Sequence, residues 1–315
     1  FRPGWTSLVH ILSGRQQTSL LLEMLELTIV PLAWHCGFWA ILCFVVSTIT
    51  GNVSQVDKLW SITPALYAWQ IAVFSEFHTR AVLMASLATI WAVRLTYNFA
   101  RRGGYTWPPW EGEEDYRWPI LRKNPYLSHP VAWMAFNLGF ISFYQHALLL
   151  VIVLPEIMAT SSEGGLNLMD WVLALLFLLL VMVEYQADQQ QYEYQTEKYR
   201  LKGAKQPLYG EYEVGFLRTG LWSMSRHPNY FAEQSIWIVF YLFSVSGGAG
   251  LINWTIIGAI LYVLLFQGSV AFSEGITAGK YPRYAEYQAT VPLFIPNPTM
   301  FKPFWNDGAT MKKRR

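Results

Sequence analysis

A cluster of basic and amide side chains stands at the start of an apolar stretch in the second half of the chain. The sequence GLWSMSRHPNYFAEQSIWIVF, residues 220–240, places Arg226 and His227 directly before Pro228. Proline suits the first turn of a helix, whose free backbone N–H groups face outward. Such a turn, flanked by an arginine, forms a site for an anion such as phosphate. An ordinary basic flank of a membrane helix is the simpler alternative.

Polar side chains continue inside that apolar stretch at helical spacing. Asn229, Glu233 and Trp237 recur every four residues, so one face of a helix carries an amide, an acid and an indole. A basic flank does not explain Glu233, because a carboxylate is costly inside a membrane. The pattern predicts that this face lines the more polar, aromatic part of a ligand.

A second polar stripe leaves an earlier apolar run, in VEYQADQQQYEYQTEKYR. Glu184, Asp188, Gln191, Gln195 and Lys198 fall within a stripe about 80° wide on a helix. The first two lie at the edge of the apolar run, where a carboxylate usually faces the interior of a helix bundle and indicates function. For the last two residues of the stripe, a solvated helix face is the favoured interpretation.

Three shorter segments hold further candidates. WEGEEDYRWPILRKN places Asp115 beside Arg117, in either a solvated charged loop or a cofactor site. KYPRYAEYQATVPLFIP places Tyr284 and Tyr287 three residues apart, where they either line a cofactor or anchor the chain at the interface. In VDKLWSITPALYAW, Asp57 is either a helix N-terminal charge or an acid that faces a substrate.

Composition indicates that these residues are positioned by membrane helices. Of 315 residues, 53% are hydrophobic and only 14% are charged, whereas soluble domains carry roughly 25% charged residues. A net charge of +2 gives no reason to expect nucleic acid as a partner. Cys36 and Cys43 lie in an apolar run and are expected to be buried thiols. The sequence has no Walker motif and no His/Cys ligand set, so no metal is predicted.

Apolar runs and loop charges predict an all-α integral membrane protein with about seven transmembrane helices. Lysine and arginine gather in the loops at 101–128 and 188–226 and in the tail after residue 272, but are absent from 155–165 and 247–251. The positive-inside rule then places the C-terminus in the cytosol. The predicted spans are 28–50, 58–76, 80–100, 129–154, 166–187, 228–246 and 252–272.

The two ends of the chain carry their own expectations. Since the sequence begins with Phe1, we expect residues 1–27 to be a flank whose true start lies further upstream. Residues 297–315 form a basic cytosolic tail that ends in Lys-Lys-Arg-Arg, which resembles a dilysine retrieval signal of endoplasmic reticulum membrane proteins. A basic tail on anionic lipid is the alternative.

Taken in order, the motifs resemble the steroid 5-alpha-reductase-like family, in its branch once labelled as a domain of unknown function. They read KLWSITPALYAW, RLTYNFARRGGY, GEEDYRW, ADQQQYEYQ, GLWSMSRHPNYFAEQSIW and KYPRYAEYQ…PLFIP. The resemblance implies a membrane domain over residues 28–296, with NADPH held between the C-terminal helices and the cytosolic loops. It also implies hydride transfer to an alkene conjugated to a carbonyl.

The resemblance and the residue patterns together assign the site. The expected catalytic residues are Asp57, Tyr67 and Glu233. The expected NADPH-binding residues are Asp115, Arg117, Glu184, Asp188, Gln191, Arg226, His227, Asn229, Tyr230, Trp237, Tyr284 and Tyr287. A histidine-rich run of the true steroid reductases is replaced here by GSVAFSEGITAGK, so the resemblance does not imply a steroid as the substrate.

The function predicted is NADPH-dependent reduction of a carbon–carbon double bond in a lipid-soluble steroid-, sterol- or enone-type substrate, in the endoplasmic reticulum membrane. An isoprenylcysteine-type methyltransferase using S-adenosylmethionine is one alternative, because Arg226-His227-Pro228-Asn229-Tyr230 also resembles its motif. The upstream segments ADQQQ and GEEDYRW favour the reductase. A membrane protein that binds lipid or sterol without catalysis is the other alternative.

Overall fold

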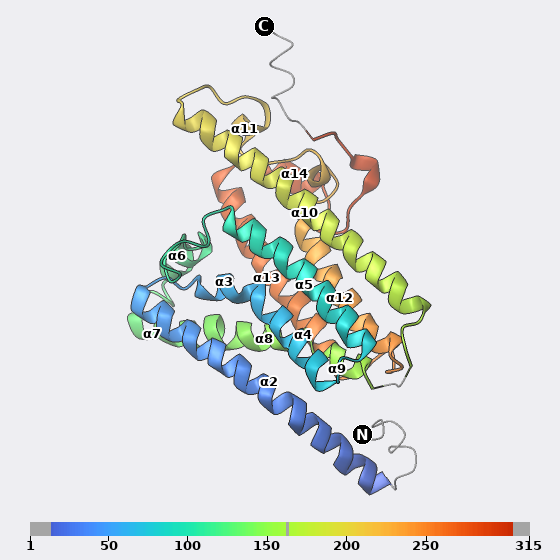
Figure 1. Ribbon diagram of the computed structural model, residues 1–315. Helices are drawn as coiled ribbons and strands as arrows, with labels where there is room; N and C mark the ends of the chain where they lie inside the picture. The colour runs from blue at the N-terminus through green and yellow to red at the C-terminus, as the bar shows by residue number, and fades with distance from the viewer. Residues whose placement is uncertain (1–13, 162–163, 305–315) are drawn as a thin grey trace. The chain divides into compact units, whose positions relative to one another are not determined.

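The computed structural model describes residues 14–161 and 164–304, with side chains described from residue 26 onward (Figure 1). Residues 1–13 of the predicted N-terminal flank and the terminal Lys-Lys-Arg-Arg lie outside the described residues, whereas residues 14–27 of that flank belong to a helix. The regular secondary structure of the described residues is helical, apart from an antiparallel bridge between Gly220 and Lys302. The main helices are α2 (Gly14–Thr50), α3 (Gln55–Trp60), α4 (Ile62–Phe74), α5 (Thr79–Ala100), α6 (Arg117–Arg122), α7 (Pro130–Phe136), α8 (Gln145–Val151), α9 (Pro155–Ala159), α10 (Leu168–Gly203), α11 (Gly210–Val214), α12 (Pro228–Ser246), α13 (Ile256–Lys280) and α14 (Tyr284–Thr290).

Five described helical stretches are long and apolar enough to cross a membrane, by length and composition. In length and composition, these are the helices of a multi-pass membrane protein. They are Glu26–Thr50, Thr79–Ala100, Pro130–Ala159, Leu168–Gly203 and Ile256–Lys280. The predicted total of seven spans stays a prediction.

The predicted span at 58–76 is divided between α3 and α4. Pro64 has no backbone N–H to donate to the carbonyl of Trp60, so a continuous helix cannot pass this point with all its hydrogen bonds made. α4 has 13 residues, about 20 Å at 1.5 Å per residue, which is short of a hydrocarbon core of about 30 Å. α12 has 19 residues, and its first two turns contain the polar Asn229, Glu233 and Gln234.

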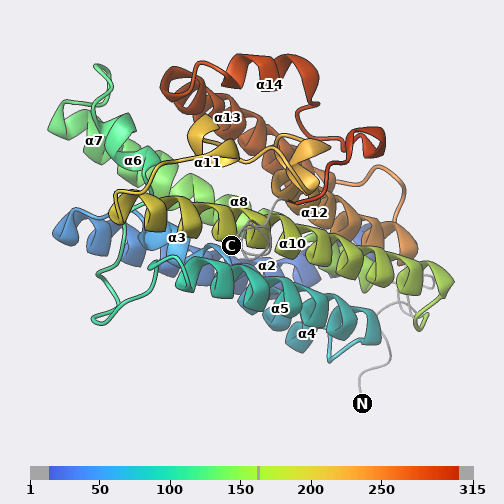
Figure 2. The same cartoon turned by 90° about the horizontal axis from the view of Figure 1, so that it is seen from above.

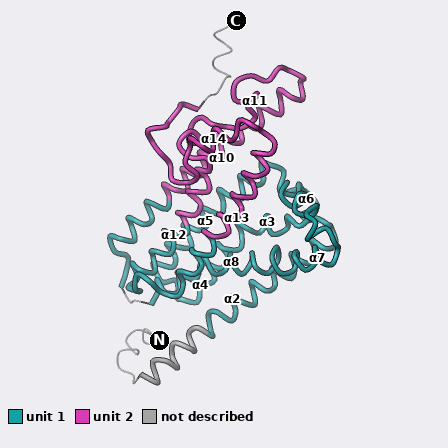
Figure 3. Tube along the Cα trace, turned by 180° about the vertical axis from the view of Figure 1, so that it is seen from behind, with its two compact units in different colours: residues 1–177, 237–262 teal, residues 178–236, 263–315 magenta. Residues whose placement is uncertain are grey.

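The chain divides into two compact units, each built from separate stretches (Figure 3). Unit 1 comprises Phe1–Phe177 and Trp237–Tyr262, and unit 2 comprises Leu178–Ile236 and Val263–Arg315. The boundaries fall inside α10, α12 and α13, so each of these helices contributes to both units.

Unit 1 is organised around α4 and α5, which lie side by side (Figures 1 and 2). Trp91 of α5 is fully buried and packs edge-on against Trp237, with ring centroids 4.9 Å apart. Close backbone approach is possible because glycine has no side chain. A Cβ on Gly247 would lie 2.4 Å from the Ala159 carbonyl oxygen, which is too close for any other residue without a shift.

One end of unit 1 holds a fully buried ion pair. Arg80 Nε lies 2.9 Å from Asp170 Oδ1, and Arg80 Nη2 lies 3.0 Å from Oδ2. Arg80 also donates to the carbonyls of Ala159 and Gly165. This guanidinium therefore joins the starts of α5 and α10 to the end of α9, and its charge is compensated within the fold.

In unit 2, residues 291–302 run alongside residues 220–227, and we call them the strap. The amide of Arg226 donates to Pro292 O over 2.9 Å, and that of His227 donates to Leu293 O over 3.1 Å. At the far end of the strap, Gly220 N donates to Lys302 O over 2.7 Å. These bonds hold the segment before α12 along its length, so the strap fixes the entry to that helix.

Candidate functional site

Two of the predicted NADPH-binding residues are in direct contact within unit 2. Asn229, in the first turn of α12, donates from Nδ2 to Asp188 Oδ1 on α10 over 3.2 Å. Next to this contact, Leu221 N donates to Gln190 Oε1 and Trp222 Nε1 donates to the carbonyl of Ala187. The same part of α10 therefore receives both the loop before α12 and the helix itself.

Two buried oxygen atoms beside this pair accept no hydrogen bond in the described structure. They are Asn229 Oδ1 and Gln191 Oε1, the latter one helical turn after Asp188. A buried polar atom without a partner costs roughly 1–3 kcal/mol, so such atoms are rare and indicate an incomplete site. Both atoms are acceptors, which fits a ligand that brings amide, amino or hydroxyl donors.

The two predicted carboxylates Glu184 and Glu233 are buried in unit 2, on α10 and α12. Tyr230 packs between rings: its ring lies nearly parallel to that of His227 at 5.3 Å and edge-on to that of Phe266 at 4.9 Å. The predicted stripe on α10 therefore does turn inward at Glu184, and so does the predicted polar face of α12 at Glu233. These contacts show packing, and the assigned roles in binding and catalysis stay predictions.

The stripe also faces inward at Lys198, so the expectation of a solvated helix face is wrong for this residue. Lys198 is buried, and its ammonium donates to the carbonyl of Gly215 and to the hydroxyl of Tyr281 over 3.0 Å. The same nitrogen lies over the rings of Tyr194 and Tyr281, 5.4 and 4.9 Å from their centroids, so its charge serves the internal contacts of unit 2. Lys198 also lowers the pKa of Tyr281 below its usual range, against the opposing effect of burial.

The residue that sequence reasoning missed is Glu274 of α13. Arg226 Nε lies 2.7 Å from Oε1 of this carboxylate, and His227 Nε2 lies 2.9 Å from the same oxygen. Tyr284 and Gln288 of α14 donate to it over 3.1 and 2.8 Å. The sequence does contain a signal for it. Glu274 is the only charged residue of α13 before Lys280, and a carboxylate in an apolar helix indicates a functional site.

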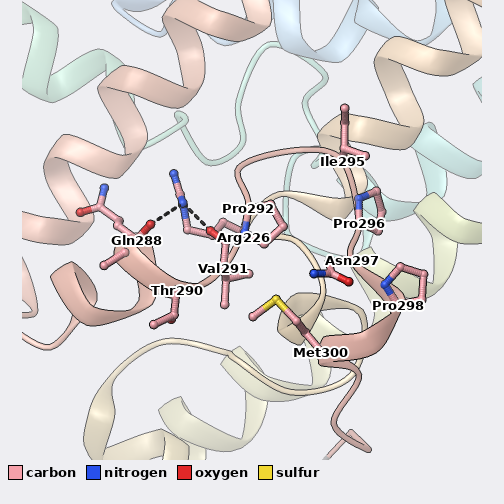
Figure 4. Close-up of a pocket in the computed structure, with 11 residues that line it drawn as sticks. Arg226, Gln288, Thr290, Val291, Pro292, Ile295, Pro296, Asn297, Pro298 and Met300 are labelled. Atoms are coloured by element: carbon pink, nitrogen blue, oxygen red, sulfur yellow. Dashed lines mark hydrogen bonds between the residues drawn. The ribbon is translucent and has the colours of Figure 1, made fainter.

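Arg226, which the sequence assigns to a phosphate, has its guanidinium engaged by the protein. Besides its ion pair with Glu274, its Nη1 donates to the carbonyl oxygens of Gln288 and Val291, over 2.9 and 2.6 Å (Figure 4). A phosphate would have to compete with these acceptors. A phosphate contact by this residue stays a prediction.

The tail tyrosines are buried rather than exposed at an interface. Tyr284 and Tyr287 pack with Phe216 in one apolar cluster. The Tyr287 hydroxyl donates to the carbonyl of Trp222, and burial raises the pKa of this phenol well above its usual range, so it stays a donor. Its position ties α14 to the segment before α12.

A surface pocket of about 570 Å³ opens beside Arg226 (Figure 4). Its walls come from the end of α14 and from the strap, including Thr290, Pro296 and Met300. The pocket is large enough for a small ligand, but seven of its eleven lining residues are apolar, and its arginine is neutralised by Glu274. It offers few of the convergent polar groups that fix a ligand.

The remaining polar candidates lie in unit 1, in a loop that closes on α3. Trp118 Nε1 donates to Asp57 Oδ2 over 3.0 Å, while Arg117 forms a two-bond ion pair with Asp115. Burial and the charge of Asp115 raise the pKa of Asp57. Burial raises that of Asp115 as well, but the charge and hydrogen bonds of Arg117 outweigh it, so the pKa of Asp115 lies below its usual range.

The pKa values of these two neighbouring carboxyl groups are thus shifted in opposite directions, as is often found for carboxyl pairs at catalytic sites. The loop itself is held by Lys58, whose ammonium donates to the carbonyls of Pro109 and Glu111. The two other unit 1 candidates are core residues: Tyr67 is fully buried in α4, and Trp237 packs with Trp91. Their assigned roles stay predictions.

Comparison with known proteins gives two matches. A family model described as "Protein of unknown function (DUF1295)" matches residues 43–291. The uncharacterized protein C594.04c of Schizosaccharomyces pombe is 36% identical over 265 residues, which is 80% of this chain and 74% of that protein. No solved structure matches. The match spans both units and every predicted site residue.

Proposed function

The chain belongs to the DUF1295 family, whose description gives no activity, and we propose from its site that it is an NADPH-dependent membrane reductase. The substrate would be a lipid-soluble molecule with a carbon–carbon double bond conjugated to a carbonyl. The observation that carries the proposal is the pair of unsatisfied acceptors, Asn229 Oδ1 and Gln191 Oε1, beside Asp188. The ordered resemblance to the steroid 5-alpha-reductase-like family supports the choice of cofactor.

The residues of unit 2 fit a dinucleotide in donor and acceptor chemistry. NADPH brings amide, amino and ribose hydroxyl donors, and buried acceptors without partners reward a ligand that satisfies them. Asp188 adds a charged acceptor for a hydroxyl pair. In this proposal the C-terminal helices α10, α12, α13 and α14 hold the cofactor.

When bound, NADPH supplies a hydride for the β-carbon of the conjugated alkene and leaves as NADP⁺. The chain's own residues would hold the substrate, exclude water and provide the proton that completes the reduction. We assign the last task to Asp57, because burial and the charge of Asp115 raise the pKa of its carboxyl group, which favours the protonated form. Tyr67 and Glu233 are the other proposed groups.

Orientation and location complete the proposal. We place seven spans in the endoplasmic reticulum membrane with the C-terminus in the cytosol, supported by the alternation of lysine and arginine between loops. The loop that carries Asp115 and Arg117 is then cytosolic, on the side from which NADPH arrives.

The test is a thermal shift of the purified full chain in detergent with NADPH, NADH and S-adenosylmethionine in parallel. A ligand that binds only the folded state stabilises it by about 2.7 kcal/mol at a hundredfold excess over its dissociation constant. We expect NADPH to raise the melting temperature. A rise with S-adenosylmethionine alone would replace the reductase by a methyltransferase. A cooperative melt that no ligand moves would favour the non-catalytic alternative.

A further inference from the structure

Side chains from several elements of unit 2 converge on one buried carboxylate, that of Glu274. Its Oε1 receives Arg226 Nε at 2.7 Å and the Tyr284 hydroxyl at 3.1 Å, with His227 Nε2 at 2.9 Å. Its Oε2 receives Gln288 Nε2 at 2.8 Å and Arg226 Nη2 at 3.2 Å. The Glu274 side chain is only 9% exposed. Charge-assisted bonds in a buried site are strong and directional, so this carboxylate fixes its partners.

The partners of Glu274 come from the two segments that flank the entrance of α12. Arg226 and His227 are the last residues before that helix, and Tyr284 and Gln288 belong to α14. The backbone amides of Arg226 and His227 are held separately, by carbonyls of the strap. The segment is thus fixed both along its backbone and at its side chains.

The residue that this arrangement would position is Asn229, two residues after His227. Asn229 lies in the first turn of α12, and its amide reaches Asp188 at 3.2 Å, which is near the long end for a hydrogen bond. A small movement of the preceding residues would break that contact and misplace the unsatisfied Asn229 Oδ1. A shift of about 1 Å in a supporting group is enough to cost a site much of its function.

We infer that Glu274 is the positioning residue of the dinucleotide site: it holds Arg226 and His227 so that Asn229 faces Asp188. The inference rests on the proposed function for its ligand, but the geometry it explains belongs to the free protein. It assigns Arg226 to the same positioning task, because the Nε, Nη1 and Nη2 atoms of its guanidinium all donate to protein oxygens. Loss of either residue should then weaken NADPH and NADH equally.

The first experiment compares dissociation constants of NADPH and NADH for the full chain in detergent. Glu274→Gln keeps the shape of the side chain but replaces one acceptor oxygen with a donor, which faces the donors Arg226 and Gln288. We expect it to weaken both dinucleotides at least tenfold and by the same factor. Adding Arg226→Gln to Glu274→Gln should cost less than about another twofold, since both changes remove the same contact.

Two further variants supply a milder change at the same carboxylate and a matched control. Tyr284→Phe removes one donor to Glu274 while its ring can still pack edge-on to Phe216, so we expect a weakening of about threefold in a chain that folds normally. Glu286→Gln changes an exposed carboxylate of the same helix α14 and should leave both affinities unchanged. Unchanged affinity in Glu274→Gln, additive losses in the double variant, or a loss confined to NADPH would each overturn the inference.

A second readout separates this inference from the proposed function. Hydrogen–deuterium exchange on ligand-free protein reports the amides of Arg226 and His227, which are bonded to the strap. In Glu274→Gln these amides should exchange at least tenfold faster, while those of the Lys198 region keep their wild-type rates. If the wild-type chain binds no dinucleotide, the proposed function fails, but this measurement still decides the role of Glu274: unchanged exchange overturns it.

Discussion

Asp188 and Asn229 are 41 residues apart in the chain, yet the amide of Asn229 donates directly to the carboxylate of Asp188. The contact joins α10 to the first turn of α12 and leaves one amide oxygen of Asn229 buried without a partner. This relationship makes the pair the centre of the proposed site.

Replacing Asp188 by asparagine should weaken NADPH binding by tenfold or more. The amide keeps the size of the side chain and an acceptor for Asn229, but it removes the charge that would bind ribose hydroxyls. A tenfold loss corresponds to about 1.4 kcal/mol, which isothermal calorimetry resolves. Gln186→Ala is the matched control, because Gln186 is exposed on the same helix and should leave the affinity unchanged. Equal affinities in the Asp188 variant and the control would move the site elsewhere.

Gln191→Met should separate stability from binding. Methionine removes an oxygen that is buried without a partner, so the free energy of unfolding of the ligand-free chain should stay equal or rise by about 1 kcal/mol. NADPH affinity should nevertheless fall, because the ligand loses the acceptor that it would satisfy. Melting temperatures with and without NADPH measure both effects. A variant that is destabilised but binds normally would contradict this role for Gln191.

The paired carboxyl groups of the α3 loop should give opposite pH dependences. The pKa of Asp57 is raised by burial, so folding stability falls as pH rises from the ordinary carboxyl pKa toward the raised one. Asp57→Asn should remove that decline and gain stability at neutral pH. The pKa of Asp115 is lowered, so its contribution is present above the ordinary carboxyl pKa and is lost as pH falls through the folded value.

Melting temperatures of the wild type, Asp57→Asn and Asp115→Asn between about pH 4 and pH 8 test both signs. Asp115→Asn should lower stability most at neutral pH, because it leaves Arg117 without the carboxylate that it grips through two bonds. Parallel pH curves in all three proteins would show that neither group titrates as described.

Arg80→Met should be among the most destabilising single changes in unit 1. It leaves the fully buried carboxylate of Asp170 without its cation, which typically costs about 3–5 kcal/mol. Adding Asp170→Leu should recover much of the loss, because an apolar pair carries no desolvation cost. The exposed ion pair of Arg200 with Glu197 supplies the control, since Arg200→Gln should leave the melting temperature unchanged. A double variant no better than Arg80→Met would contradict the account.

Orientation in the membrane can be read from engineered cysteines. Cys36 and Cys43 are 8% and 3% exposed, so the wild-type chain should react little with a membrane-impermeant thiol reagent. A cysteine at the exposed position Glu113 should react from the cytosolic side, and one at Leu251, which is 69% exposed, only from the opposite side. Labelling of both positions from one side would refute the proposed topology.

The sequence predicted the helices better than their contacts. Runs of apolar residues identify five described helices that can cross a membrane, because length and composition are local properties. The division between α3 and α4 also has a local signal, because Pro64 lacks the N–H that a continuous helix would need. Periodicity also singled out Asp188 and Asn229, and the two side chains are in contact.

Contacts between residues that are distant in the sequence could not be predicted from periodicity. Nothing near Glu274 says that Arg226, 48 residues earlier, is its counter-ion, or that Trp118 holds Asp57 across 61 residues. A spacing rule gives the face on which a side chain lies, but it cannot give the element that packs there. Lys198 shows the same limit, since its stripe continued a polar face and its ammonium is nevertheless buried.

The strap has a consequence for how the protein is made. The ribosome releases Arg226 long before the carbonyl of Val291 that it binds, 65 residues later. Since synthesis runs from the N-terminus, α12 and α13 are complete while the segment between residues 220 and 227 still lacks its backbone partners. The proposed site is therefore complete only after residues 291–302 have been translated. A chain truncated before residue 291 would have these helices but would lack the backbone partners of the segment before α12, and so would lack the proposed site.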